Sequence, residues 1–133
     1  MSQENVEVVR QTVKAVNQRD IEKVISLTDP GAELHSAIVG GAEGSVFRGH
    51  DGFRDWFAQS MASFEELTTE LTEFRDVGDR VIAFGNIQAR GRESGLELDS
   101  ETGWVFTVRD GRVLRAEGFL SREQALKAAG LSE

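Results

Sequence analysis

The dipeptide Asp110-Gly111 constrains the fold of this chain more than any other feature of its sequence. Runs of alternating apolar and polar residues precede and follow it, over 101–109 and 112–120. Such runs around an Asp-Gly pair are a strong short-range signal of a β-hairpin with a two-residue turn. Alternate residues of a strand point to opposite faces, so one face of this hairpin can line a pocket while the other meets a partner.

The two faces of the predicted hairpin differ in chemistry. A regular register pairs Val108 with Val113, Phe106 with Arg115 and Trp104 with Glu117. The opposite face is small and apolar apart from one hydroxyl: Gly103, Val105, Thr107, Leu114, Ala116, Gly118 and Leu120. Charged side chains are rarely buried, so we expect the small face to line the interior. The large face is then exposed in the monomer or covered by a second subunit, and we predict a homodimer through Trp104, Phe106 and Arg115. A shift of one residue in the register would exchange these roles.

The composition limits the class of protein. A length of 133 residues fits one domain spanning 1–133. The chain has no cysteine, which excludes disulfides and thiolate chemistry. Fifteen basic against 23 acidic residues give a net charge of −8, and the arginines are scattered, so we expect neither nucleic-acid nor membrane binding. The polar N-terminus does not resemble a signal peptide, and we predict a cytoplasmic location.

The helices are predicted from spacing and caps. Ser2 can cap a first helix whose apolar face repeats at helical spacing: Val6, Val9, Val13 and Val16. Asp20 is the expected N-cap of a short second helix, which ends at Asp29-Pro30-Gly31. A third helix begins near His50 or Asp51 and carries an aromatic face: Phe53, Trp56, Phe57, Met61 and Phe64. Ser121 starts a capping-box pattern for a last helix that ends before Gly130.

The strands follow from alternation and turns. Short strands are predicted over 32–37 and 46–48, around a glycine-rich loop at 38–45. Long strands are predicted over 67–77, 80–92, 98–109 and 112–120. This order of elements predicts an α+β domain. We expect a cone-shaped barrel, made of a curved, mostly antiparallel sheet with helices packed on its concave face and a pocket between them.

Several segments match a known family. They are Asn-Gln-Arg-Asp-Ile at 17–21, Asp-Pro-Gly-Ala-Glu-Leu-His-Ser at 29–36, Phe-Arg-Gly-His-Asp-Gly-Phe-Arg-Asp-Trp-Phe at 47–57, Asp-Arg-Val at 79–81 and Val-Arg-Asp-Gly-Arg-Val at 108–113. Over nearly its whole length the chain resembles the SnoaL-like family of the nuclear transport factor 2 superfamily. That superfamily includes polyketide cyclases, ketosteroid isomerase, epoxide hydrolases and proteins with no demonstrated activity, so the resemblance implies the fold more than the chemistry.

The resemblance places different residues at the positions that are catalytic in relatives. The carboxylate base of ketosteroid isomerase falls at His35, its oxyanion-hole tyrosine near Thr12 and its protonated aspartate near Gly103. The aspartate of the epoxide hydrolases falls at Gly118. Glycine therefore replaces the acid at two of these positions, histidine replaces it at the third, and the chain has no tyrosine.

His35 is the candidate catalytic residue, because an imidazole titrates near neutral pH and suits proton transfer. Glu33 shares its strand face and is the expected partner acid and substrate contact. The alternatives are a polar packing residue at the pocket wall for His35 and a solvated strand end for Glu33.

Further candidates for substrate binding come from the strands and the third helix. Asn86 and Gln88 alternate with apolar residues on the second long strand and match a polar pair of the epoxide hydrolases, but they also suit an exposed sheet face. Thr107 is the hydroxyl on the expected inner face of the hairpin. Phe53 and Trp56 can form a pocket wall or simply belong to the core. The two histidines have no metal-ligand spacing, so neither a metal nor another cofactor is expected.

Two functions remain open at this point. One is a cofactor-independent isomerase, cyclase or dehydratase acting on a small apolar substrate, with His35 as base and Asn86 and Gln88 polarising the substrate. The other is a non-catalytic ligand-binding or accessory dimerisation module. A pocket packed solid by aromatic side chains would remove both ligand hypotheses.

Overall fold

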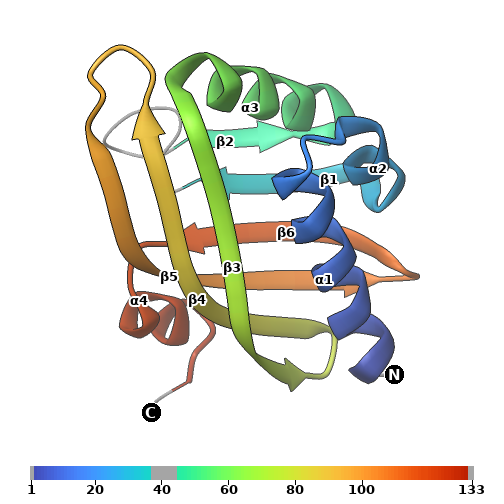
Figure 1. Ribbon diagram of the computed structural model, residues 1–133. Helices are drawn as coiled ribbons and strands as arrows, with labels where there is room; N and C mark the ends of the chain where they lie inside the picture. The colour runs from blue at the N-terminus through green and yellow to red at the C-terminus, as the bar shows by residue number, and fades with distance from the viewer. Residues whose placement is uncertain (1, 37–44, 132–133) are drawn as a thin grey trace.

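The computed structural model describes residues 2–36 and 45–131 (Figure 1). Its helices are α1 (Ser2–Asn17), α2 (Ile21–Ser26), α3 (Gly49–Ser63) and α4 (Arg122–Ala128). Its strands are β1 (Thr28–Ser36), β2 (Ser45–Arg48), β3 (Phe64–Val77), β4 (Arg80–Gly91), β5 (Glu97–Arg109) and β6 (Arg112–Phe119). Most of the loop predicted at 38–45 and the end of the strand predicted at 32–37 lie outside the described residues.

The strands form one six-stranded sheet in the order β2-β1-β6-β5-β4-β3. Strands β1 and β6 run parallel, and every other neighbouring pair is antiparallel. Figure 1 shows the sheet curving around α1 and α3. The α+β fold with a curved, mostly antiparallel sheet is therefore confirmed, but the sheet is open, with β2 and β3 at its edges, rather than a closed barrel.

The predicted caps explain where the short helices begin. The Asp20 side chain accepts a hydrogen bond of 3.1 Å from the amide of Lys23, at the start of α2. The Ser121 hydroxyl accepts one of 3.1 Å from the amide of Gln124, at the start of α4. Gly130, with a φ of +76°, follows the last residues of α4 as predicted. No helix in the described ranges is both long and apolar enough to cross a membrane.

The hairpin prediction is right at the turn and wrong beyond it. Arg109 pairs with Arg112 and Val108 with Val113, as expected, but the register then shifts. The next pairs are Thr107–Arg115, Phe106–Ala116, Val105–Glu117 and Trp104–Gly118. One extra residue, Leu114, therefore forms a β-bulge on β6, and every β6 residue after it pairs with the β5 neighbour of its expected partner.

The bulge overturns the predicted faces of β5, whereas Ala116 and Leu120 line the interior as expected. Phe106 is 4% exposed and packs in the main core, with Trp104 packed against the same cluster. The predicted dimer contact through Trp104 and Phe106 is therefore wrong, because these rings face the interior. Arg115 and Glu117, which were expected beside them, lie on the outer face with Val105 and Thr107.

Both faces of the sheet are covered at β4 and β5. The concave face packs against α1, α2 and α3, while α4 packs on the opposite face over Ile82, Phe84 and Val105. Gly103 permits this second layer, since a Cβ there would lie 2.6 Å from the Cβ of Ala125. Gly103 therefore faces α4 rather than the interior, which corrects the expected inner face of the hairpin.

Candidate functional site

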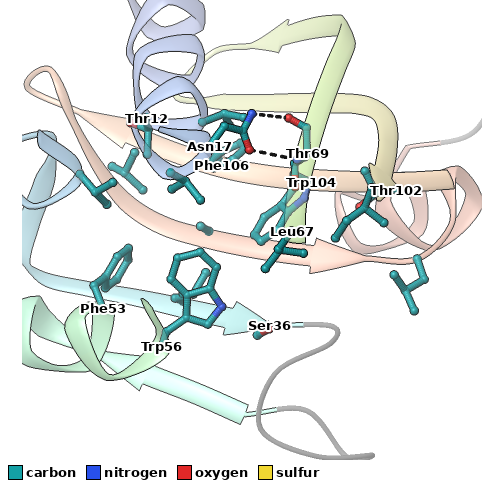
Figure 2. Close-up of a pocket in the computed structure, with 18 residues that line it drawn as sticks. Thr12, Asn17, Ser36, Phe53, Trp56, Leu67, Thr69, Thr102, Trp104 and Phe106 are labelled. Carbon is teal, nitrogen blue, oxygen red and sulfur yellow. Dashed lines mark hydrogen bonds between the residues drawn. The ribbon is translucent and has the colours of Figure 1, made fainter. Parts of the chain in front are cut away.

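A cavity of about 70 Å³ lies between the concave face of the sheet and helices α1, α2 and α3 (Figure 2). The helices contribute Thr12, Val13, Val16, Asn17, Val24, Phe53 and Trp56. The sheet and the segment after β6 contribute Leu34, Ser36, Leu67, Thr69, Ile87, Thr102, Trp104, Phe106, Val113, Ala116 and Leu120. A single water needs roughly 10–15 Å³, so the cavity can hold a molecule of several heavy atoms.

Aromatic rings form two opposing parts of the wall. Phe53 and Trp56 lie on α3, and Figure 2 shows them across the cavity from Trp104 and Phe106 on β5. The Trp104 and Phe106 rings are stacked, with centroids 5.6 Å apart and planes 18° from parallel. Aliphatic side chains fill most of the rest of the wall.

Most of the polar lining groups already have partners within the protein. The Asn17 side chain donates to the Thr69 carbonyl oxygen at 2.7 Å and accepts from the Thr69 amide at 3.0 Å (Figure 2). The hydroxyls of Thr12 and Thr102 each donate to a backbone carbonyl at 2.8 Å. Among the buried polar side-chain atoms of the described lining residues, only Nε1 of Trp104 lacks a hydrogen-bond partner.

None of the 18 described lining residues carries a side chain that titrates near neutral pH. General acid–base catalysis requires such a group within hydrogen-bond reach of the reacting atoms. What this lining offers a molecule is mainly apolar contact and aromatic surface. The described residues also contain no cluster of three acidic or histidine side chains that could hold a metal ion.

The predicted site residues divide between the two faces of the sheet. Phe53 and Trp56 line the cavity. Asn86 pairs with Glu101 and Gln88 with Asp99, on the exposed outer face of β4 and β5. The Asn86 amide donates to the Asp99 carboxylate at 3.3 Å. The expectation that Asn86 and Gln88 face the pocket is therefore wrong.

Thr107 lies outside the cavity as well. It pairs with Arg80 on one side and Arg115 on the other. The cavity is lined instead by its neighbour Phe106, as the alternation of strand β5 requires. The expectation that Thr107 lies on the inner face of the hairpin is therefore wrong.

His35 and Glu33 also lie on the outer face, while Leu34 between them lines the cavity. His35 Nε2 is 3.1 Å from the Glu33 carboxylate. The hydrogen bond from His35, aided by the guanidinium groups of Arg48 and Arg115, holds the pKa of the Glu33 carboxyl below its ordinary value. The predicted pair is thus real, but the backbone of β1 separates it from the cavity.

The sequence reasoning missed most of the sheet side of the cavity. Sequence alternation puts Trp104 and Phe106 on the opposite face and gives no signal for Thr102 or Ile87, although Ala116 is on the expected inner face and does line the cavity. One signal was available: Val113 and Ala116 are both apolar and three residues apart, which strict alternation cannot place on one face. A bulge between them is the simplest way to bury both.

The fold and the cavity define a small α+β protein with an interior pocket between a curved sheet and its helices. The chain belongs to the SnoaL-like domain family, whose family model matches residues 9–116. No protein with a curated description matches it.

Crystal structures of several proteins are similar in fold. TerC, co-crystallised with polyporic acid, is 23% identical, with a TM-score of 0.76 over 96% of this chain and 97% of TerC. A protein of Burkholderia pseudomallei, described as NTF2-like and of unknown function, is 19% identical, with a TM-score of 0.79 over 93% and 95% of the two chains. A Catenulispora acidiphila protein with a ketosteroid isomerase-like fold, in complex with trimethylamine, is 17% identical, with a TM-score of 0.75 over 95% and 94%.

Proposed function

We propose that this protein binds a small, uncharged and predominantly apolar molecule in the cavity between α1, α3 and β5. The observation that carries the proposal is the chemistry of the wall, which combines four aromatic rings with aliphatic side chains and has no titratable group among the described lining residues. Apolar pockets with few polar groups are typical of small-molecule sites. Crystals of TerC with polyporic acid and of the Catenulispora protein with trimethylamine support a binding role for this fold.

Binding is favoured over acid–base catalysis for a geometric reason. His35, the candidate base, lies on the other side of the sheet from the cavity, and its imidazole is hydrogen-bonded to Glu33. The glycine positions at 103 and 118 supply no acid in its place. A non-catalytic ligand-binding role therefore fits the described residues better than an isomerase, cyclase or dehydratase with His35 as base.

Isothermal titration calorimetry with two probes of similar size tests this proposal. Acetophenone is uncharged and should bind with a dissociation constant between roughly 10 µM and 1 mM. Benzoate carries a carboxylate that would be buried without a cation, so its affinity should be at least about tenfold lower. Equal affinity for the two probes, or no binding of acetophenone, would contradict the proposal.

Two variants locate the bound probe. Ala116→Leu adds a larger side chain to the floor of the cavity and should reduce acetophenone affinity by about tenfold or more. His35→Ala alters the outer face of β1 only and should leave the affinity within about twofold of the original value. Thermal unfolding of both variants checks that they are folded. A strong loss of binding in His35→Ala alone would place the ligand on the other face.

A further inference from the structure

The indole of Trp104 lies across the neighbouring strand instead of standing up into the cavity. Trp104 on β5 pairs with Gly118 on β6. A Cβ at Gly118 would lie 2.8 Å from both Cζ2 and Cη2 of the indole. The ring therefore occupies the space that a side chain at residue 118 would otherwise fill.

Phe106, two residues further along β5, packs against the same indole. Its ring stacks nearly parallel to the indole, with the centroids 5.6 Å apart. A side chain at residue 118 would have to push the indole away from β6. Trp104 itself lines the cavity, so such a displacement changes the shape and volume available to a ligand.

Glycine is needed at residue 118 because a side chain would collide with the indole, and not because the backbone conformation requires glycine. Its φ lies outside the positive range that L-residues avoid, unlike that of Gly111 in the turn, where φ is +76°. An alanine at residue 118 therefore introduces a contact with the indole without backbone strain. This makes the position a clean test of what the indole does.

The same side chain carries the unused donor of the site. Nε1 of Trp104 is buried and has no partner among the described residues. A buried donor without a partner is unfavourable. Because Nε1 is inaccessible to solvent here, an acceptor atom on a ligand can complete this hydrogen bond only when the indole shifts.

We infer that Trp104 and Gly118 together determine which molecules the cavity accepts. The missing side chain at Gly118 allows the indole to pack against β6. In this position the ring limits the size of the ligand. Its Nε1 favours a ligand with one acceptor atom. The preferred ligand is thus a compact, uncharged ring compound carrying one carbonyl or ether oxygen. The inference rests on the proposed binding function and assigns its specificity to this pair.

Size selectivity is tested with acetophenone and the two-ring ketone 2-acetylnaphthalene, by calorimetry on the full chain. Gly118→Ala should lower acetophenone affinity by about tenfold, because the displaced indole narrows the cavity. Trp104→Phe removes the atoms that meet a Cβ at residue 118. It should shift the affinity ratio towards the two-ring ketone by about tenfold.

The double variant, Trp104→Phe with Gly118→Ala, separates this role from a general effect on folding. It should recover most of the acetophenone affinity that Gly118→Ala loses. Failure of the double variant to recover binding would overturn the inference. If Gly118→Ala does not fold, Trp104→Phe alone tests the inference. In that case, an unchanged ratio of the affinities for acetophenone and 2-acetylnaphthalene overturns the inference.

The donor is tested with ethylbenzene, which matches acetophenone in size but lacks the carbonyl. The preference for acetophenone over ethylbenzene should fall by about threefold to tenfold in Trp104→Phe. The added volume affects both probes, so the ratio reports the hydrogen bond. An unchanged ratio contradicts the assignment of Nε1. If the unmodified protein binds none of these probes, the proposed function itself fails, which is a different result from binding without these preferences.

Discussion

At the scale of single residues, Asn17 connects a helix to the edge of the sheet. Strand β3 is an edge strand, so one side of its backbone has no neighbouring strand. The Asn17 amide donates to the Thr69 carbonyl oxygen and accepts from the Thr69 N–H, at 2.7 and 3.0 Å. One side chain thus satisfies both backbone groups of Thr69 and fixes the end of α1 beside the cavity.

Replacing this side chain should therefore destabilise the protein. We expect Asn17→Ala to lower the free energy of unfolding by about 2–3 kcal/mol, because two hydrogen bonds are lost and two backbone groups of Thr69 lose their partner. Urea denaturation measures the change. Gln18→Ala, at the exposed next position, is the control and should stay within about 0.5 kcal/mol of the original protein. Equal effects of the two substitutions would mean that the Asn17 contacts contribute little.

At the scale of helices and strands, α4 is attached to the outer face of the sheet by charge as well as by packing. Arg122 donates two hydrogen bonds of 2.9 Å to the Glu73 carboxylate on β3. Its guanidinium also lies 4.1 Å from the centre of the Phe84 ring. The hydrogen bonds from Arg122, together with Arg75, hold the pKa of the Glu73 carboxyl below its ordinary value.

This lowered pKa predicts how stability changes with pH. The ionised form of Glu73 is favoured by folding, so its contribution is fully present above the ordinary carboxyl pKa of about 4.3 and is lost as the pH falls through the lowered folded value. The difference in free energy of unfolding between the original protein and Glu73→Gln should be constant from neutral pH to about pH 5 and shrink below that. Urea denaturation at a series of pH values measures it.

Glu93→Gln provides the control for that series. Glu93 is exposed and forms no ion pair within the described ranges. The Glu93→Gln substitution should change the free energy of unfolding only slightly, and this change should not decrease as the pH falls below about 5. A Glu73→Gln difference that is independent of pH would show that the Arg122 contact does not stabilise α4.

Strand β6 shows what alternation can and cannot predict. The sequence predicts the turn at Asp110-Gly111, the strands on either side and the pairing of Val108 with Val113, all of which are confirmed. A bulge adds a single residue, Leu114, and leaves the run of strand-forming residues unbroken. Period-two reasoning therefore assigned the charges of Arg115 and Glu117 to the face of Trp104.

At the scale of the whole molecule, the family and the α+β fold follow from the sequence, but the position of the cavity does not. Phe53 and Trp56 were placed at a pocket wall because helical spacing puts them on one face of α3. The prediction of which strand residues line the cavity depended on the assumption that only one face of the hairpin is buried. Helix α4 buries Val105 on the other face as well, and this long-range packing is not visible in local patterns.

The fold also changes where a second subunit could bind. Helix α4 packs on the outer face of β4 and β5 and also contacts β6. Among the described residues, no helix packs on the outer face of β1 at Glu33, and the neighbouring side chains of Arg48 and Arg115 are exposed. That face carries acids and bases close together, with Arg115 Nε 3.3 Å from the Glu117 carboxylate and Arg48 Nε 3.4 Å from that of Glu33. In a two-fold dimer through this face, any contact between a base of one copy and an acid of the other occurs twice.

The homodimer stays a prediction, now placed on this face with Arg115 as its remaining predicted contact. Sedimentation at micromolar concentration should show a dimer that weakens as the salt concentration rises, because exposed charge pairs are screened. Arg115→Glu should weaken it by at least about tenfold, since it sets like charges against each other. Arg109→Glu makes the same change of charge at the exposed hairpin end and should leave it intact. A monomer at all concentrations, or equal sensitivity to the two substitutions, would contradict a dimer on this face.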